Sequence, residues 1–323
     1  MQQRVLGKTG LSVSAITLGG GGIGMVWGAT TEDECIETVK YAVACGINII
    51  DVAPVYGKGK AEEVVGTAWP DLVTKPLLAT KVLILPRERG DLSGAIRRSL
   101  EGSLTRLGRE QIDIFQLHNQ IEPREPVSPL RLTLQEVVGT GGVLETMQQL
   151  KEEGLVREIG FTGIARHDVV RELFTDGRLA TVQLVTNILN SEGEMGVAED
   201  EPYRDHLEMV DLARSAQCGI FGIRPFAAGS LTAAVDRSLP ADHPVAVDFA
   251  FGQRHLGFLT AETGSSLAVV AMRYALSVPG VSTVVTGAKN RAELDDAIVA
   301  AQAGPLPSAL MERIATLQQT RRP

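Results

Sequence analysis

The chain has 323 residues, of which 44% are hydrophobic and 22% are charged, as in globular proteins that bury a large core. Its formal net charge of -8 leaves no basic stripe that could neutralise phosphate groups, so we expect no nucleic-acid partner. Cys35, Cys45 and Cys218 lack the spacing of a metal site or of a disulfide framework. The sequence shows no secretion signal and no apolar run long enough to cross a membrane, so we expect a cytoplasmic protein without a metal or a membrane partner.

Short apolar runs alternate with longer amphipathic segments along the chain, in the pattern of βαβ units. We predict strands at 15–18, 47–51, 77–81, 112–117, 158–162, 181–185, 219–224 and 283–286. We predict helices at 32–45, 61–69, 91–107, 143–153, 168–174, 204–217, 265–277 and 291–302. Buried parallel strands that alternate with helices close most naturally into a (β/α)8 TIM barrel. The prediction is therefore one α/β domain over 1–323, with a hairpin at about 1–15 and a tail at about 303–323.

A doubly wound open sheet is the alternative fold. It would show a glycine-rich turn after the first strand, leading directly into a helix that holds a phosphate. Gly19–Gly22 followed by Gly24 only partly resembles that turn, and we predict no helix directly after it. The barrel is therefore favoured. Its long connections at 120–141, 191–201 and 232–263 follow strands, so we expect them at the C-terminal face, around a substrate pocket.

Polar side chains stand at the ends of three successive predicted strands. Asp51 closes one strand and Tyr56 lies five residues further on, in a loop rich in proline and glycine. Lys81 ends the next strand, and His118 directly follows the one after that. Because the carboxyl ends of barrel strands meet at one mouth, we expect these four residues to lie together as the catalytic site.

At these residues the sequence resembles the aldo/keto reductase superfamily. The similarity is carried by IIDVAPVYG at 49–57, AEEVVG at 61–66, ATK at 79–81, IDIFQLH at 112–118, LKEEGLVREIG at 150–160 and VVTGA at 284–288. The resemblance spans nearly the whole chain. It implies a TIM barrel and an NAD(P)-dependent oxidoreductase that reduces an aldehyde, ketone or sugar carbonyl to the alcohol, or runs the reverse reaction.

The four residue types suit that chemistry. Hydride addition to a carbonyl develops negative charge on its oxygen, and a proton must then arrive from a nearby donor. Tyr56 is the expected donor, and the ammonium of Lys81 would lower its high pKa. Asp51 would pair with Lys81, and neutral His118 would orient the carbonyl, as the resemblance also implies.

The resemblance also implies where a nicotinamide cofactor binds. Family members hold the carboxamide with a Ser-Asn pair and a Gln, and here Thr162, Gly163 and Gln183 occupy those places. Gly163 has no side chain with which to donate a hydrogen bond. The other positions that match cofactor contacts are Gly21, Ile223, Arg224, Pro225, Phe226, Gly229, Leu231 and Gly287.

Ile223 stands where the family stacks an aromatic residue on the nicotinamide, and Arg224 replaces a small polar residue. Arg224 could therefore reach the cofactor or the substrate, or serve only in a salt bridge.

The turn before the last helix matches the family's adenosine-phosphate region. Lys289 and Arg291 could hold a 2′-phosphate, whereas a carboxylate at Glu293 would repel it, and Asp296 matches a position that contacts adenine. We expect NADP(H), with NAD(H) as the alternative.

The expected substrate pocket contains Trp27, Tyr56 and His118. Neither the substrate nor the oligomeric state follows from the sequence. Two other functions stay open: an NAD-dependent aldose dehydrogenase, and a nicotinamide-binding regulatory subunit that resembles potassium-channel β subunits.

Overall fold

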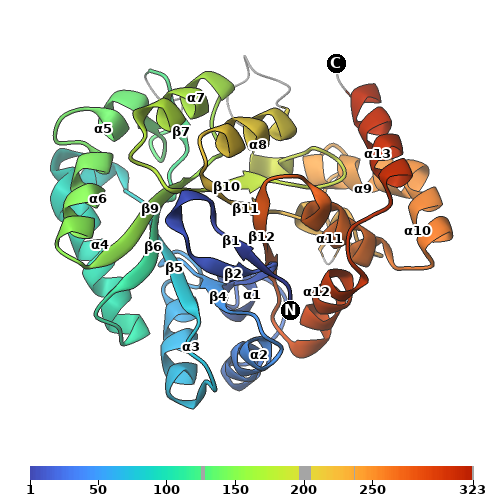
Figure 1. Ribbon diagram of the computed structural model, residues 1–323, viewed down its shortest axis with the longest axis horizontal. Coiled ribbons are helices and arrows are strands. Elements are labelled where there is room, and N and C mark those ends of the chain that lie inside the picture. Colours follow the sequence, from blue (N-terminus) through green and yellow to red (C-terminus); the bar gives the residue numbers. More distant parts are fainter. Residues whose placement is uncertain (125–127, 196–204, 236, 322–323) are drawn as a thin grey trace.

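The computed structural model describes residues 1–124, 128–195, 205–235 and 237–321. Its centre is a closed barrel of parallel strands in the order β10-β11-β12-β3-β4-β5-β6-β9, surrounded by helices (Figure 1). The strands are β3 (Ile16–Gly19), β4 (Ile49–Asp51), β5 (Leu77–Val82), β6 (Ile112–Leu117), β9 (Val156–Thr162), β10 (Thr181–Val185), β11 (Gly219–Ile223) and β12 (Val281–Gly287). The predicted α/β barrel in a single domain is confirmed.

The outer helices follow the strands in turn. They are α2 (Glu32–Ala44), α3 (Lys60–Ala68), α4 (Leu92–Leu107), α6 (Val143–Glu152), α7 (His167–Asp176), α8 (His206–Ser215), α11 (Leu267–Ser277) and α12 (Arg291–Ala303). Several begin at a side-chain cap, as where the Thr31 hydroxyl accepts a hydrogen bond from the Glu34 N–H at 3.2 Å. All agree with the predicted helices to within a few residues, although position 204, at the start of one prediction, lies outside the described residues.

Two predictions at the barrel mouth are wrong. The glycine run does form a helix, the single turn α1 (Gly20–Ile23). It was not predicted because glycine has a low helix propensity. The strand predicted over 219–224 ends at Ile223, because Arg224 turns into the left-handed region with φ of 56°.

The long connections also contain short elements that were not predicted. The first holds β7 (Ile121–Glu122), β8 (Leu132–Thr133) and α5 (Leu134–Val138), and the last holds α9 (Pro244–His255) and α10 (Gly257–Thr263). The connection at 191–201 is described only as far as residue 195. The C-terminal tail carries α13 (Ser308–Thr320), which lies beside α9 at one edge of the barrel in Figure 1.

The N-terminal hairpin closes the bottom of the barrel. Its strands β1 (Gln3–Val5) and β2 (Ser12–Ser14) pair antiparallel and lie across the barrel opening that faces the viewer in Figure 1. Leu6 and Val13 are fully buried there against Ile49, Ile114 and Phe221 from inside the barrel. With its amino-terminal end plugged by this apolar cluster, the barrel is open to ligands only at the carboxyl ends of its strands.

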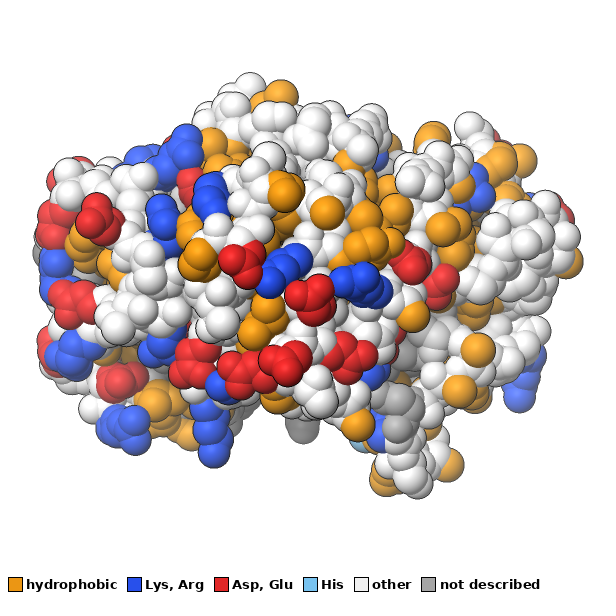
Figure 2. Space-filling model, turned by 90° about the horizontal axis from the view of Figure 1, so that it is seen from below, with side chains coloured by type: hydrophobic (Ala, Val, Ile, Leu, Met, Phe, Trp, Pro, Cys, Tyr) orange, Lys and Arg blue, Asp and Glu red, His pale blue; other side chains and the backbone are white. Residues whose placement is uncertain are grey.

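The surface carries both signs of charge. The face shown in Figure 2 has acidic and basic side chains interspersed, without a continuous basic area. Of the cysteines, Cys35 and Cys218 are buried, Cys45 is half-buried, and all three are free thiols. Among the described residues, no helix has the length and hydrophobicity needed to span a bilayer.

Candidate active site

The four residues predicted to be catalytic come together at the carboxyl end of the barrel. Asp51 ends β4 and Lys81 lies near the end of the neighbouring strand β5, while His118 directly follows β6. Tyr56 lies in the loop that leads from β4 to α3. Because β4, β5 and β6 are adjacent parallel strands, their ends place these side chains around one point.

Lys81 and Asp51 form a buried ion pair. The Lys81 ammonium donates to Asp51 Oδ2 at 2.7 Å and to the Val52 carbonyl at 3.0 Å. The Lys81 side chain is 0% exposed and that of Asp51 3% exposed. Burial on this scale is tolerated only when both charges are neutralised and hydrogen-bonded. The pair is therefore fixed in place.

Gln183 completes this pair from across the barrel. Its side-chain amide donates to Asp51 Oδ1 at 2.8 Å, and it comes from β10, which lies opposite β4 in the strand order. The hydrogen bond therefore crosses the interior of the barrel. Gln183 was predicted to hold a cofactor, but in the structure its amide nitrogen is committed to Asp51.

A second buried carboxylate supports the strand that carries Lys81. Glu62, on α3, accepts a hydrogen bond from the Thr80 hydroxyl at 2.6 Å and pairs with the Arg106 guanidinium at 2.6 Å. Thr80 directly precedes Lys81 in β5. The AEEVVG segment thus contributes a structural anchor beneath the site.

Tyr56 lies against both Lys81 and His118. The Lys81 Nζ atom is 4.9 Å from the centre of the Tyr56 ring, and the Tyr56 and His118 rings meet edge to face with centroids 5.7 Å apart. Burial raises the pKa of Tyr56, the charge of Lys81 lowers it, and the charge of Asp51 raises it, with a net increase. Tyr56 therefore carries its proton at neutral pH.

The charges of Lys81 and His118 follow from their surroundings. Burial lowers the pKa of Lys81, but the neighbouring Asp51 and Tyr56 outweigh that effect, so its pKa lies above the usual value. Burial, and then the charge of Lys81, lower the pKa of His118 to about 3. The site thus combines an ammonium, a carboxylate, a protonated phenol and a neutral imidazole.

Asn119, beside His118, was not singled out by the sequence analysis. The oxygen of its side-chain amide accepts a hydrogen bond from the Ile84 N–H at 2.8 Å. The amide nitrogen donates to the Ile84 carbonyl at 2.9 Å and to the Leu130 carbonyl at 2.8 Å. Asn119 therefore joins the loops after β5 and β6. Its position next to His118, at a strand end, is the signal that could have identified it.

The structure brings together Thr162, Gly163 and Gln183, the residues predicted to contact the carboxamide. The Thr162 hydroxyl is buried and has no hydrogen-bond partner among the described residues, as expected of a group that awaits a ligand. Gly163 has no room for a side chain, since a methyl group there would lie 2.6 Å from the Leu184 side chain. The packing against β10 thus accounts for this departure from the family pattern.

Trp27 covers two of the predicted cofactor positions. A methyl group on Gly21 would lie 2.2 Å from the Trp27 ring, and one on Gly287 would lie 2.7 Å from it. The two glycines thus let the ring approach the backbone closely at both positions. Trp27 is still 40% exposed, so it forms a wall of the mouth rather than part of the core.

The segment after β11 has an unusual backbone. Ala227 and Ala228 share with Arg224 a positive φ, and Gly229 has φ of 95°. The short 3-10 turn Ala227–Gly229 results, and Leu231 N donates to the Phe226 carbonyl at 3.1 Å. The segment also contains the predicted Pro225, which is buried.

The predicted phosphate-binding residues are already paired. Lys289 Nζ forms an ion pair with Glu293 Oε1, and the Lys289 N–H donates to Glu293 Oε2 at 3.1 Å. Arg291 pairs with Glu37 of the neighbouring helix α2 at 2.8 Å. Asp296 is exposed on the same helix. A 2′-phosphate would have to compete with Glu293 for Lys289.

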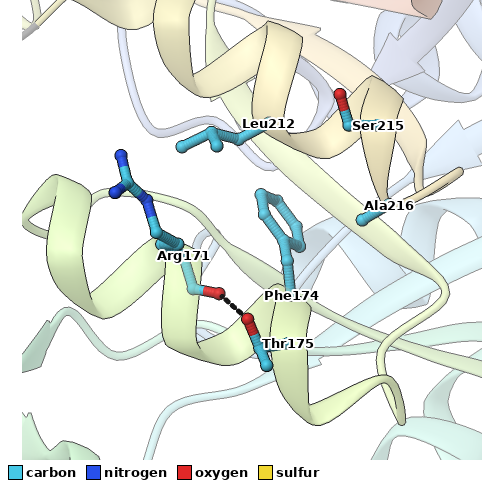
Figure 3. Close-up of a pocket in the computed structure, with 6 residues that line it drawn as sticks. All are labelled: Arg171, Phe174, Thr175, Leu212, Ser215 and Ala216. Atoms are coloured by element: carbon cyan, nitrogen blue, oxygen red, sulfur yellow. Dashed lines mark hydrogen bonds between the residues drawn. The ribbon is translucent and has the colours of Figure 1, made fainter.

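Two surface cavities lie away from this site. One, of 190 Å³, is an apolar hollow between α7 and α8 in which Phe174 and Leu212 face each other (Figure 3). The other, of 630 Å³, lies at the amino-terminal ends of β5, β6 and β9, beside Trp69 and Arg109. Neither includes a residue of the catalytic cluster. Among the described residues, no group of His, Cys, Asp and Glu side chains could hold a metal ion.

Comparison with known proteins identifies relatives over most of the chain. Residues 15–319 match the sequence profile of the aldo/keto reductase family. The chain is 27% identical over 304 residues to L-galactose dehydrogenase of Arabidopsis thaliana, which covers 93% of this chain and 88% of that protein. It is 31% identical over 208 residues to the NADH-specific methylglyoxal reductase of Escherichia coli (strain K12), which covers 59% of this chain and 60% of that protein.

A solved structure has the same fold. The aldo-keto reductase from Klebsiella pneumoniae in complex with NADPH superimposes with a TM-score of 0.72 at 20% identity, over 98% of this chain and 95% of that chain.

The surroundings of His118 predict that its imidazole stays neutral. Since its pKa is lowered to about 3, its nitrogen-15 NMR signals should not move between about pH 5 and about pH 8, where an ordinary histidine titrates. The chain has five histidines, so the His118→Asn variant identifies the signals by their disappearance. A titration midpoint near the usual value of about 6.5 would contradict the buried, neutral state.

Proposed function

The chain belongs to the aldo/keto reductase family and is an NAD(P)H-dependent oxidoreductase that acts on carbonyl compounds, and we propose that Tyr56, assisted by Lys81, Asp51 and His118, is its proton donor. The observation that carries this proposal is the buried Lys81–Asp51 pair beside a protonated tyrosine.

The residues support proton transfer in both directions. In reduction, the Tyr56 hydroxyl gives its proton to the carbonyl oxygen as negative charge develops there. The phenolate left behind is stabilised by the ammonium of Lys81, whose Nζ lies 4.9 Å from the ring. In alcohol oxidation the same phenolate takes the proton back. Asp51 keeps Lys81 charged and in position throughout.

His118 positions the substrate oxygen. Its imidazole is neutral and meets Tyr56 edge to face, so a ring N–H can donate to the same oxygen that Tyr56 protonates. Nδ1 has no hydrogen-bond partner among the described residues, so nothing in the described fold fixes which nitrogen carries the proton. A bound carbonyl therefore selects the tautomer that donates to it.

Several groups fit a nicotinamide dinucleotide, which when bound supplies or accepts the hydride. The buried Thr162 and Thr286 hydroxyls have no partners among the described residues, and the backbone of Gly21 and of Gly287 lies close to the Trp27 ring. Thr162 would hold the carboxamide, and Ile223 would pack against the ring.

Lys289 and Arg291 would hold a 2′-phosphate, so we favour NADP(H). The Klebsiella relative was solved with NADPH, whereas the Escherichia relative is named NADH-specific, so NAD(H) stays the alternative.

The hydroxyl of Tyr56 is the group to remove first. Tyr56→Phe should abolish turnover, because the proton donor is lost, while the affinity for cofactor stays within a few fold. A matched control is Tyr41→Phe, which removes a hydroxyl bonded to Asp295 on the surface and should keep full activity. The measurement is oxidation of NADPH and NADH over a panel of aldehydes, ketones and sugars. Near-normal turnover by Tyr56→Phe would refute its role, and tight cofactor binding without turnover by the unaltered protein would favour the regulatory-subunit alternative.

Cofactor preference should depend on Glu293. In Glu293→Gln the Lys289 ammonium is released and a negative charge beside the 2′-phosphate is removed, so NADPH should bind roughly three- to tenfold tighter. NADH, which lacks that phosphate, should bind almost unchanged. Asp295→Asn is the matched control, since this carboxylate on the same helix bonds Tyr41 instead. The measurement is the affinity for NADPH and for NADH by fluorescence titration. If the unaltered protein binds NADH tenfold more tightly than NADPH, the NADP(H) preference is ruled out.

A further inference from the structure

Arg224 is a half-buried cation whose hydrogen-bonding capacity is mostly unused. Its Nε and Nη2 atoms are buried and have no hydrogen-bond partner among the described residues, whereas Nη1 donates to Met195 Sδ at 2.9 Å. Within the described parts of the chain, no carboxylate lies within 4.0 Å of its guanidinium. A buried arginine normally pairs with an acid, because burying an unpaired charge costs several kcal/mol.

The nearest acids are already engaged. Asp248 accepts hydrogen bonds from the Arg321 guanidinium and the Ser191 hydroxyl, both at 2.6 Å. Glu192 lies 2.9 Å from the His206 imidazole. Burial lowers the pKa of Arg224, and the charges of Glu194, Asp248 and Glu192 oppose this only through space. Among the described residues, these acids thus act on Arg224 at a distance and none is paired with it directly.

The free donors form one recognition edge. Nε and Nη2 lie on the same side of a guanidinium, and together they donate two parallel hydrogen bonds to the two oxygens of a carboxylate or a phosphate. Gly193 lies close to this edge, because a methyl group there would lie only 3.0 Å from Nη2. The backbone of Arg224 is held at φ of 56°, which is costly for a residue with a side chain.

This edge lies on the rim of the catalytic mouth. Arg224 follows Ile223, the last residue of β11. Met195, which contacts the guanidinium, accepts a hydrogen bond on its carbonyl from the Gln120 side chain at 3.2 Å. Gln120 lies two residues beyond His118. Met195 thus links the guanidinium of Arg224 to the loop that follows His118.

We propose that Arg224 is a specificity residue that binds an anionic group, a carboxylate or a phosphate, on the carbonyl substrate. The proposal rests on the proposed function, since it assigns a substrate class to the same site. The other anion that could reach this edge is the cofactor's own pyrophosphate, and the experiment separates the two.

The test compares substrates that differ only in the anion. The pairs are succinic semialdehyde with butanal, for a carboxylate, and glyceraldehyde 3-phosphate with glyceraldehyde, for a phosphate. We expect kcat/KM to favour the anionic member of at least one pair by about tenfold or more. In Arg224→Met this preference should vanish through an increase in KM, with the neutral substrate changed less than about threefold. Arg224→Lys should keep part of the preference.

Arg237→Met is the matched control, since Arg237 is an exposed arginine on the same side of the barrel and its loss should leave the preference intact. Two further measurements do not need turnover. Succinate should raise the melting temperature of the unaltered protein and not that of Arg224→Met. In urea, Arg224→Met should unfold at the same or a higher concentration, because it removes an unbalanced buried charge. If Arg224→Met misfolds, Arg224→Gln replaces it.

Three results would overturn the proposal. One is equal kcat/KM for both members of each pair in the unaltered protein. Another is an equal loss for anionic and neutral substrates in Arg224→Met, which would indicate a structural role. The third is a tenfold weaker affinity for NADPH with the substrate preference unchanged, which would assign Arg224 to the cofactor. If no aldehyde is turned over but succinate still stabilises the protein through Arg224, the proposed function fails and the anion site stands.

Discussion

The ion pair between Lys81 and Asp51 lies where water cannot screen it, so its energy depends on every other hydrogen bond that the two groups make. The Val52 carbonyl and the Gln183 amide supply those bonds, the second from the opposite strand of the barrel. Closing the barrel and forming the pair are therefore coupled. Burial raises the pKa of Tyr56 and lowers that of His118, and the same ammonium opposes the first effect and adds to the second. The proton transfer that we propose therefore depends on this pair.

Around this fixed centre the ligand-binding residues depart from the family pattern, each for a local physical reason. Gly163 packs too closely on Leu184 to carry a side chain, and the Glu293 carboxylate forms an ion pair with the ammonium of Lys289. Arg224 places an unbalanced positive charge at the rim. The proposed catalytic centre thus follows the family pattern, while the proposed cofactor and substrate positions depart from it.

The sequence predicts most of the barrel because its strands are short apolar runs separated by amphipathic helices, a local signal. The strand ends that carry Asp51, Lys81 and His118 follow from the same signal. Contacts across the barrel do not, which is why the hydrogen bond from the Gln183 amide to Asp51 was not predicted. Backbone conformations that tertiary packing imposes were also not predicted. Examples are the helix Gly20–Ile23, which consists mostly of glycine, and the left-handed conformation of Arg224.

The central claim is that the ammonium of Lys81 stabilises the Tyr56 phenolate and so holds the pKa of Tyr56 below the value that burial and Asp51 alone would give it. It is tested most directly by the pH dependence of kcat/KM for alcohol oxidation, which requires the Tyr56 phenolate, in the unaltered enzyme and in Lys81→Met. Without the ammonium, the phenolate forms only at higher pH, so the rising limb of the profile should move upward by at least about one pH unit. A lower rate with an unshifted profile would contradict the account.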